Sequence, residues 1–312
     1  MALYLVTGGA GFIGSNIVEE LVLRGERVRV FDNFSTGTQA NLARFGGRIE
    51  VINGDIRVLD ALRAAVAGAE YVLHQAALPS VPRSIEDPVT ANEVNITGTL
   101  NVLVAARDAK VKRVVFAASS SAYGNIAVSP KREDLPAMPA SPYAIGKLAG
   151  EYYCQVFHQV YGLETVALRY FNVFGPRQDP QSLYAAVIPK FITALMKKEA
   201  PTIYGDGAQT RDFTYVANVV SANLLACTAR GAAGRVFNVA CGESVSLLDL
   251  FGQIARLLAA DVTPVFAAER PGDVKHSLAD ITAARTVLGY TPLVPFAEGM
   301  ARTVEYFRTL PS

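Results

Sequence analysis

The sequence predicts an α/β fold in which helices cover both faces of a doubly wound parallel sheet. In the first half of the chain, short runs rich in β-branched residues alternate with segments of helical length. This alternation is typical of parallel sheets, because each parallel connection needs a crossover. We expect strands at residues 3–7, 27–32, 49–55, 71–76, 113–119 and 165–174, with helices that include residues 12–24, 59–67, 95–108 and 143–161.

The pattern changes after about Asn172, where prolines separate shorter elements. We therefore expect a first domain at residues 1–171 and a smaller second lobe at residues 172–312. Segments within residues 213–240 have the pattern of elements that return to the main sheet. The second lobe is accordingly predicted to be discontinuous.

Composition excludes several classes of function. Lys and Arg number 29 against 28 for Asp and Glu, so a nucleic acid is not expected as a partner. No segment reaches the ~20 apolar residues of a membrane helix, and we expect a soluble, unexported protein of the cytoplasm. The three cysteines and three histidines show no ligand spacing, which predicts free thiols and no metal.

A glycine pattern follows the first predicted strand. Gly8, Gly11 and Gly14 form Gly-x-x-Gly-x-x-Gly before a helix, where backbone N–H groups can approach a pyrophosphate. A tight turn that serves only packing is the alternative. Asp32 ends the next strand, where a carboxylate can accept hydrogen bonds from an adenosine ribose and would repel a 2′-phosphate. The pattern predicts a Rossmann-type domain that binds NAD, and Asp55 is either an adenine contact or a turn residue.

A Tyr-x-x-x-Lys pair opens a later predicted helix. Ser141 has the character of an N-cap and Pro142 of a first helical residue. Tyr143 and Lys147 then lie on one helix face, where an ammonium and a cationic nicotinamide would favour the phenolate. Such a pair also occurs by chance, as a surface aromatic and its lysine.

The pair follows the serine-rich strand exit 117–124, and here the chain resembles the extended short-chain dehydrogenase/reductase family. Within that family it is similar to the UDP-glucose and UDP-N-acetylglucosamine 4-epimerases, over essentially its whole length. The resemblance is carried by residues 7–14, 119–124, Tyr143 with Lys147, 169–172, 211–213 and 270–273.

The resemblance implies a role for each matching residue. Ser119 would be the catalytic hydroxyl, Tyr143 the acid and base, and Lys147 the group that lowers the tyrosine pKa and holds the nicotinamide ribose. Positions that match NAD contacts are Gly8, Gly11, Phe12, Ile13, Asp32, Asn33, Ser35, Thr36, Gly37, Asp55, Ile56, Gln75, Ala76, Ala77, Asn92, Tyr143, Lys147 and Tyr170. Positions assigned to the UDP-sugar are Ser80, Arg83, Ser119, Ser120, Ser121, Tyr143, Asn172, Ala186, Val187, Tyr204, Arg211, Arg270, Asp273 and Ser277.

The same resemblance separates the expected reaction from related ones. Dehydratases of the family carry an Asp-Glu pair directly after the catalytic hydroxyl, and decarboxylases carry a Glu at the second of these positions. This chain has Ser120 and Ser121 there, so the resemblance implies only C4 chemistry through a 4-keto sugar. Two guanidiniums, Arg211 and Arg270, suit a diphosphate, although ion pairing with neighbouring aspartates is the alternative.

Three further expectations concern substrate and assembly. UDP-glucuronate is an alternative substrate, with Arg83 and Ser84 as donors to its carboxylate, and a non-catalytic nucleotide-sugar-binding protein is an alternative function. Ser277 matches a position where tyrosine excludes N-acetylated sugars in the family, unless it only caps a helix near Asp280. Helices 95–108 and 143–161 are apolar on more than one face, as in dimeric relatives, and candidate contacts are Leu100, Leu103, Val104, Tyr152, Val156 and Val160.

Overall fold

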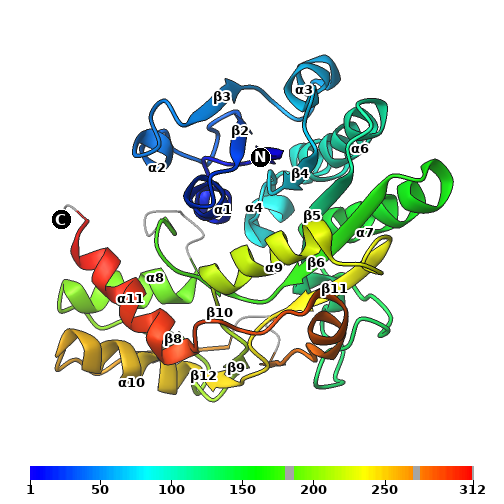
Figure 1. Ribbon diagram of the computed structural model, residues 1–312. Helices are drawn as coiled ribbons and strands as arrows, with labels where there is room; N and C mark the ends of the chain where they lie inside the picture. Colours follow the sequence, from blue (N-terminus) through cyan, green and yellow to red (C-terminus); the bar gives the residue numbers. More distant parts are fainter. Residues whose placement is uncertain (180–185, 270–274, 311–312) are drawn as a thin grey trace.

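A seven-stranded parallel sheet forms the centre of the protein in the computed structural model, which describes residues 1–179, 186–269 and 275–310 (Figure 1). The strand order is β11-β6-β5-β4-β1-β2-β3, so the order reverses beside β1. These strands are β1 (Leu3–Thr7), β2 (Arg27–Asp32), β3 (Ile49–Asn53), β4 (Tyr71–His74), β5 (Arg113–Ser119), β6 (Glu164–Tyr170) and β11 (Arg235–Val239). The predicted fold class is confirmed.

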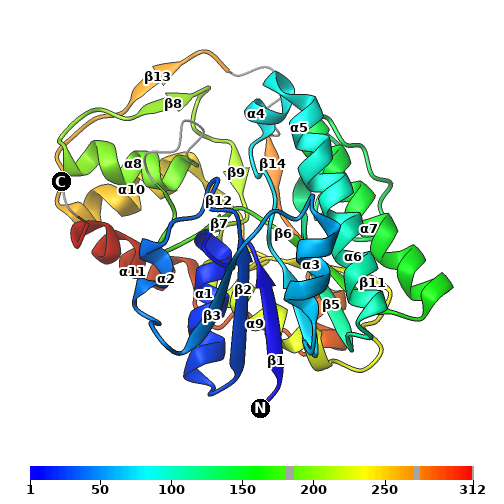
Figure 2. The same cartoon turned by 90° about the horizontal axis from the view of Figure 1, so that it is seen from above.

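Helices cover both faces of the sheet (Figure 2). One face is covered by α1 (Phe12–Leu23) and α9 (Val216–Thr228), and the other by α3 (Leu59–Val66), α6 (Thr99–Asp108) and α7 (Pro142–Tyr161). Successive residues of a strand point to opposite faces, so Val6 packs beneath α1 while Leu5 packs toward α3 and α6. Both faces of the strands are therefore apolar, which is the reason that the sequence lacks strict alternation there.

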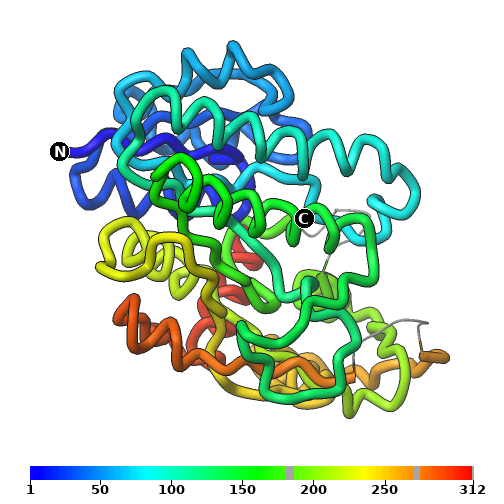
Figure 3. The backbone as a smooth tube through the Cα atoms, turned by 90° about the vertical axis from the view of Figure 1, so that its right-hand side faces the viewer, coloured from blue at the N-terminus to red at the C-terminus, as the bar shows by residue number. Residues whose placement is uncertain are grey.

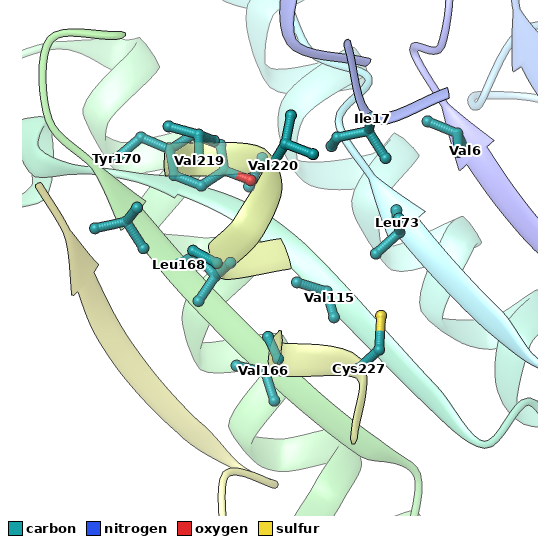
Figure 4. Close-up of a cluster of buried hydrophobic side chains, with 14 of the residues drawn as sticks. Val6, Ile17, Leu73, Val115, Val166, Leu168, Tyr170, Val219, Val220 and Cys227 are labelled. Atoms are coloured by element: carbon teal, nitrogen blue, oxygen red, sulfur yellow. The ribbon is translucent and has the colours of Figure 1, made fainter. Parts of the chain in front are cut away.

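Residues distant in sequence form the hydrophobic core between the sheet and the helices α1 and α9 (Figure 4). Ile17 of α1 and Val219 of α9 meet Val6, Val115 and Val166 of three strands, all fully buried. From the later part of the chain, β11 pairs with β6 of the main sheet and α9 packs against β5 and β6. The predicted boundary at 171/172 falls between β6 and β7 and stays a prediction.

The remaining elements are short and pair over long distances. Three small sheets join β7 (Val173–Phe174) to β10 (Thr214–Tyr215), β8 (Thr202–Tyr204) to β13 (Val265–Ala267), and β9 (Thr210–Arg211) to both β12 (Val245–Ser246) and β14 (His276–Ser277). The helices beside them are α8 (Val187–Met196), α10 (Leu247–Leu258), α11 (Phe296–Arg308) and the short π-helix η3 (Ala284–Leu288). In Figure 3 the orange segments that follow α9 lie at the bottom and the blue and cyan first third lies at the top.

Several predicted boundaries are wrong by a few residues, and one predicted strand is two. The expected strand 165–174 breaks after Tyr170, because Asn172 adopts a φ of +33° that no strand can continue. The expected strands 49–55 and 71–76 end at Asn53 and His74. The expected helix 95–108 begins earlier, with the π-helix η1 (Glu93–Gly98) leading into α6, and the short helices α2 (Ala40–Ala43), α4 (Val81–Glu86) and α5 (Pro88–Asn92) were not predicted.

Candidate active site

A cleft of about 1460 Å³ lies across the carboxyl ends of the main sheet. A second cavity of about 540 Å³ adjoins it beside α8 and shares Asn172, Lys190 and Arg211 with it. Ligands of open α/β sheets bind at this edge, where the strand order reverses. The predicted site residues that line the larger cleft are Gly8, Gly11, Phe12, Ile13, Asp32, Asn33, Ser35, Thr36, Asp55, Ile56, Gln75, Ala76, Ala77, Ser80, Arg83, Ser119, Ser120, Ser121, Tyr143, Lys147, Tyr170, Asn172, Ala186, Arg211 and Ser277.

The turn between β1 and α1 is shaped for a close approach of backbone and ligand. Gly8 has a φ of +69°, and a Cβ on Gly14 would lie 2.1 Å from the carbonyl oxygen of Gly8. Gly11 is the N-cap of α1 and offers no side chain to its first N–H groups. These N–H groups and the positive end of the helix dipole suit the pyrophosphate of NAD.

Asp32 both braces this turn and faces the cleft. Its carboxylate accepts hydrogen bonds from the backbone N–H of Ala10 at 2.9 Å and of Phe34 at 2.8 Å. Each carboxylate oxygen keeps a further acceptor position, so the residue can still bind a ribose hydroxyl. Together with the glycine turn, Asp32 fits an NAD cofactor.

Asp55 has a different local role. Its carboxylate accepts hydrogen bonds from the Arg57 guanidinium at 2.8 Å and from Asn33 at 3.0 Å. The hydrogen bond from Arg57 lowers the pKa of Asp55 to about 2. Asp55 therefore anchors the loop after β3 at the edge of the cleft, and its predicted adenine contact stays a prediction.

Ser119 and Tyr143 meet from two elements. Ser119 ends β5 and caps the 3₁₀ turn η2 (Ser120–Tyr123), and Tyr143 lies in the first turn of α7. That helix begins as predicted, with Ser141 accepting from the N–H of Ala144 at 3.1 Å and with Pro142 at its first position. Burial raises the pKa of Tyr143, and a hydrogen bond with the Ser119 side chain opposes that rise.

Lys147 lies one helical turn after Tyr143 and is buried. Its Nζ donates to the carbonyl oxygen of Ala117 at 2.7 Å and lies 5.0 Å from the centre of the Phe116 ring. Burial lowers the pKa of Lys147 to about 8, while the carboxylate of Glu151 acts in the opposite direction. The lysine is therefore still largely an ammonium at neutral pH, and its predicted effect on the tyrosine pKa stays a prediction.

A buried ion pair supports this lysine and was not predicted from the sequence. Glu151, one turn beyond Lys147, accepts from Arg169 of β6 at 3.0 and 2.7 Å, and its side chain is 1% exposed. The Arg169 guanidinium also lies 4.6 Å from the centre of the Tyr123 ring. The sequence signal for Glu151 is its spacing of four residues from Lys147, which places a carboxylate on the same face of an apolar helix.

The sugar end of the cleft comes from the small sheets. Arg211 of β9 lies directly beside Ser277 of β14, and its Nη1 donates to the carbonyl oxygen of Thr210 at 2.8 Å. Asn172 donates from its side-chain amide to the carbonyl oxygen of Asp212 at 3.0 Å, which ties it to the same segment. Because Ser277 lies in a strand, the alternative that it caps a helix near Asp280 is wrong.

Some predicted residues lie elsewhere. Val187 and Tyr204 line only the smaller cavity, and Arg270 and Asp273 lie outside the described residues. Gly37 packs behind the glycine turn, where a Cβ would lie 2.7 Å from the carbonyl carbon of Ala10, and it does not line either described cavity.

Asn92 is exposed at the end of α5, away from the described lining of the cleft. The neighbouring Asn95 is buried, and its side chain bonds both the N–H and the carbonyl oxygen of Leu78, at 2.9 and 3.2 Å. Asn95 thus holds the loop after β4 that carries Ala76 and Ala77. The two asparagines stand three residues apart in one helical segment, and the sequence offers no local feature that separates them.

One other lining residue was missed, and one expected residue has a different role. Lys190 lines both cavities, and its signal is a lone cation within the apolar segment of α8. Ser84 was expected to reach a sugar carboxylate, but its hydroxyl accepts from the backbone N–H of Tyr143 at 3.1 Å and donates to the carbonyl oxygen of Val81 at 2.7 Å. It therefore anchors the start of α7.

No group of three or more His, Cys, Asp or Glu side chains in residues 1–179, 186–269 and 275–310 could hold a metal ion. Within these same ranges, no helix is long and apolar enough to span a membrane. Cys154, Cys227 and Cys241 are free thiols, and all three are buried.

Comparison with known proteins gives a consistent result. Residues 4–240 match the model of the NAD dependent epimerase/dehydratase family. The chain is 42% identical over 308 residues to a UDP-glucose 4-epimerase of Mycolicibacterium smegmatis, covering 97% of this chain and 98% of the relative.

Two solved structures are similar along nearly their whole length. One is a UDP-N-acetylglucosamine 4-epimerase of Methanobrevibacter ruminantium in complex with UDP-N-acetylmuramic acid (TM-score 0.95, 42% identity, 99% and 98% coverage). The other is a UDP-glucose 4-epimerase of Thermus thermophilus in complex with NAD (TM-score 0.89, 37% identity, 99% and 100% coverage). The chain belongs to the NAD dependent epimerase/dehydratase family, and the predicted family and NAD cofactor are confirmed.

Proposed function

We propose that this member of the family is an NAD-dependent 4-epimerase of UDP-hexoses. The observation that carries the proposal is the meeting of Ser119, Tyr143 and Lys147 at one wall of a cleft whose far end holds Arg211. Ser120 and Ser121, which follow Ser119, supply no carboxylate for proton transfer at C5 or C6. The curated and solved relatives that are epimerases support the same reaction.

The chain's own groups divide the chemistry between them. Tyr143, as its phenolate, takes the proton of the C4 hydroxyl and later returns it, and Ser119 holds the tyrosine oxygen by a hydrogen bond. Lys147 contributes a buried positive charge that favours the phenolate. The glycine turn and Asp32 hold NAD, which supplies a hydride acceptor and donor for C4. The proton balance closes over one cycle, because the proton taken at the first step is returned at the second.

Epimerisation also requires the 4-keto sugar to turn over without leaving. Arg211, Lys190 and Asn172 line both cavities and suit a diphosphate that remains bound during this turn. The large cleft leaves the pyranose room to rotate.

The proposal extends to N-acetylated UDP-hexoses. Ser277 is a small residue on the cleft lining, and a strand position beside Arg211 fixes its place. Serine leaves space for an acetamido group, whereas a bulky side chain would fill it. A relative that is a UDP-N-acetylglucosamine 4-epimerase supports this range. UDP-glucuronate remains the alternative substrate, but Ser84, half of its expected donor pair, is already hydrogen bonded to Tyr143 and Val81.

We also propose that the protein is a homodimer of the cytoplasm. The outer face of α7 exposes Ile145, Tyr152, Val156 and Val160, an apolar row that water would otherwise cover. Leu103 is buried within the monomer and is not free for a partner, whereas Leu100 and Val104 are only partly buried against the same core and stay candidate contacts. Free buried cysteines suit a reducing compartment. The measurement is sedimentation of the purified protein, and a Val156→Glu variant should sediment as a monomer.

The reaction is tested with five substrates: UDP-glucose, UDP-galactose, their N-acetyl counterparts and UDP-glucuronate. We expect interconversion within the first two pairs, release of NAD on heating, and loss of nearly all turnover in Tyr143→Phe with UDP-sugar affinity retained. Full activity of Tyr143→Phe would remove this tyrosine from the mechanism. Turnover of UDP-glucuronate only would replace the proposed substrate class by the alternative.

A further inference from the structure

Ser119 is held by the turn that follows it. It ends β5 with extended backbone angles, and its Oγ accepts a hydrogen bond from the backbone N–H of Ser121 at 3.2 Å. The Oγ atoms of Ser121 and Ser119 lie 2.9 Å apart, within hydrogen-bonding distance. The Ser119 side chain also forms a hydrogen bond with the side chain of Tyr143. Three hydroxyl groups therefore form a chain, with Ser119 in the middle.

The number of hydrogen atoms limits the directions in which the hydrogen bonds of this chain of three hydroxyls can point. A hydroxyl has one donor and two acceptor positions, and the N–H of Ser121 uses one acceptor position of Ser119. When Tyr143 is a phenolate it can only accept, so Ser119 donates to it and Ser121 donates to Ser119. When Tyr143 is protonated and donates to Ser119, the hydrogen of Ser119 turns to Ser121.

We propose that Ser121 is a positioning residue whose hydroxyl lets Ser119 reverse its hydrogen bond as Tyr143 gains and loses its proton. This inference rests on the proposed function, in which Tyr143 takes a proton from the C4 hydroxyl and returns it. Ser119 and Ser121 keep their own hydrogen atoms during the reversal. The only proton that moves between molecules is the one that Tyr143 exchanges with the sugar. Epimerisation needs both states of the tyrosine in every cycle, so both directions of the chain are used.

A hydroxyl at position 121 can serve both directions, because one atom both donates and accepts. Alanine offers neither a donor nor an acceptor, and a carboxylate would only accept, which would turn the hydrogen of Ser119 away from the phenolate. Hydrogen bonds to a charged group are stronger than those to a neutral one, so the phenolate state depends more on the chain. Loss of the Ser121 hydroxyl should therefore raise the pKa of Tyr143.

The experiment compares Ser121→Ala with Ser121→Thr, which restores the hydroxyl, and with Ser120→Ala. The Ser120 hydroxyl makes no hydrogen bond to Ser119 in the described part of the chain. The first measurement is the ultraviolet tyrosinate signal of the NAD-loaded protein across pH, with the signal of Tyr143→Phe subtracted. The second is kcat and KM with UDP-glucose, and circular dichroism checks the fold of each variant.

In Ser121→Ala we expect the tyrosinate transition to move to higher pH and kcat to fall about tenfold, with KM little changed. Ser121→Thr should return both toward wild type, and Ser120→Ala should leave the transition in place. An unmoved transition in Ser121→Ala, or an equal movement in Ser120→Ala, would overturn the inference while the epimerase proposal stands. Full activity of Tyr143→Phe would overturn both together.

Discussion

The two ends of the cleft are built in different ways. The cofactor end comes mostly from one stretch of chain, residues 8–77, and its shape there is set by main-chain atoms: the glycine turn, the N-terminus of α1 and backbone N–H groups bonded to Asp32. The sugar end collects side chains from segments that are far apart, such as Asn172, Arg211 and Ser277. These segments meet because β9 pairs with β14.

This difference bears on how each end can change. Packing of one backbone against another leaves no room for an added atom, so the cofactor end tolerates few substitutions. A side chain that only lines a cavity can be replaced without moving the backbone. Substitutions at the sugar end should therefore change the substrate range of this protein without changing NAD binding.

The largest expected effect lies at the cofactor end. In Gly14→Ala the new Cβ would lie 2.1 Å from the carbonyl oxygen of Gly8, so the turn must open, at a cost of roughly 3 kcal/mol or more. Gly252→Ala in α10 is the matched control, because nothing lies within 4 Å of its Cβ position. We expect the first variant to lose NAD on gel filtration and to unfold at lower temperature, and the second to be stabilised by about 0.4–1 kcal/mol. Retention of NAD by Gly14→Ala would show that the turn is less constrained than its geometry indicates.

The second prediction concerns Lys147, where the two ends meet. Burial lowers its pKa from 10.5 to about 8, so at pH 7 the folded state holds a proton that the unfolded chain binds more tightly. Lys147→Met removes this cost, and we expect a variant without turnover that is about 1–3 kcal/mol more stable at pH 7.

The sign of the pH dependence tests this explanation. Between pH 8 and 10.5 the unfolded wild type binds more protons than the folded one, so wild-type stability should rise there relative to that of Lys147→Met. Urea unfolding at several pH values measures the difference between the two proteins. A difference that stays constant from pH 7 to 10 would contradict the assigned burial cost.

The smallest expected effect lies at the sugar end. Ser277→Tyr should lower kcat/KM for UDP-N-acetylglucosamine and UDP-N-acetylgalactosamine by about ten- to a hundredfold, since overfilling a packed site costs ~1–3 kcal/mol. UDP-glucose, UDP-galactose and NAD retention should change little. If both substrate pairs lose activity equally, the residue shapes the cleft as a whole and does not select the C2 substituent.

The sequence predicted the cofactor end more fully than the sugar end. Strands 3–7 and 27–32 were predicted with the bounds that they have, because glycine and aspartate mark their ends locally. Ser141 and Pro142 marked the start of α7 in the same way. Such signals depend on the conformation that one residue permits, and that is a property of the chain itself.

Other features of the structure depended on contacts with residues that are distant in the sequence. The break after Tyr170 follows from the left-handed backbone of Asn172, whose amide bonds the distant Asp212 segment. Asn95 bonds the loop at Leu78 and Ser84 bonds the first turn of α7, and nothing in their own neighbourhoods indicated a partner. Long-range hydrogen bonds of this kind leave no periodic pattern in the sequence.

By itself the sequence determined the alternation of the main strands and helices in the first half of the chain, the glycine turn, the acid at the end of β2 and the tyrosine and lysine of α7. Each of these follows from local backbone preference or from the spacing of residues on one helix face. Only the tertiary structure decided that Glu151 pairs with Arg169, that Ser119 meets Tyr143, and that Ser277 stands beside Arg211. These contacts depend on strand pairing and on the packing of α7 against the sheet, which bring together residues that the chain order keeps apart.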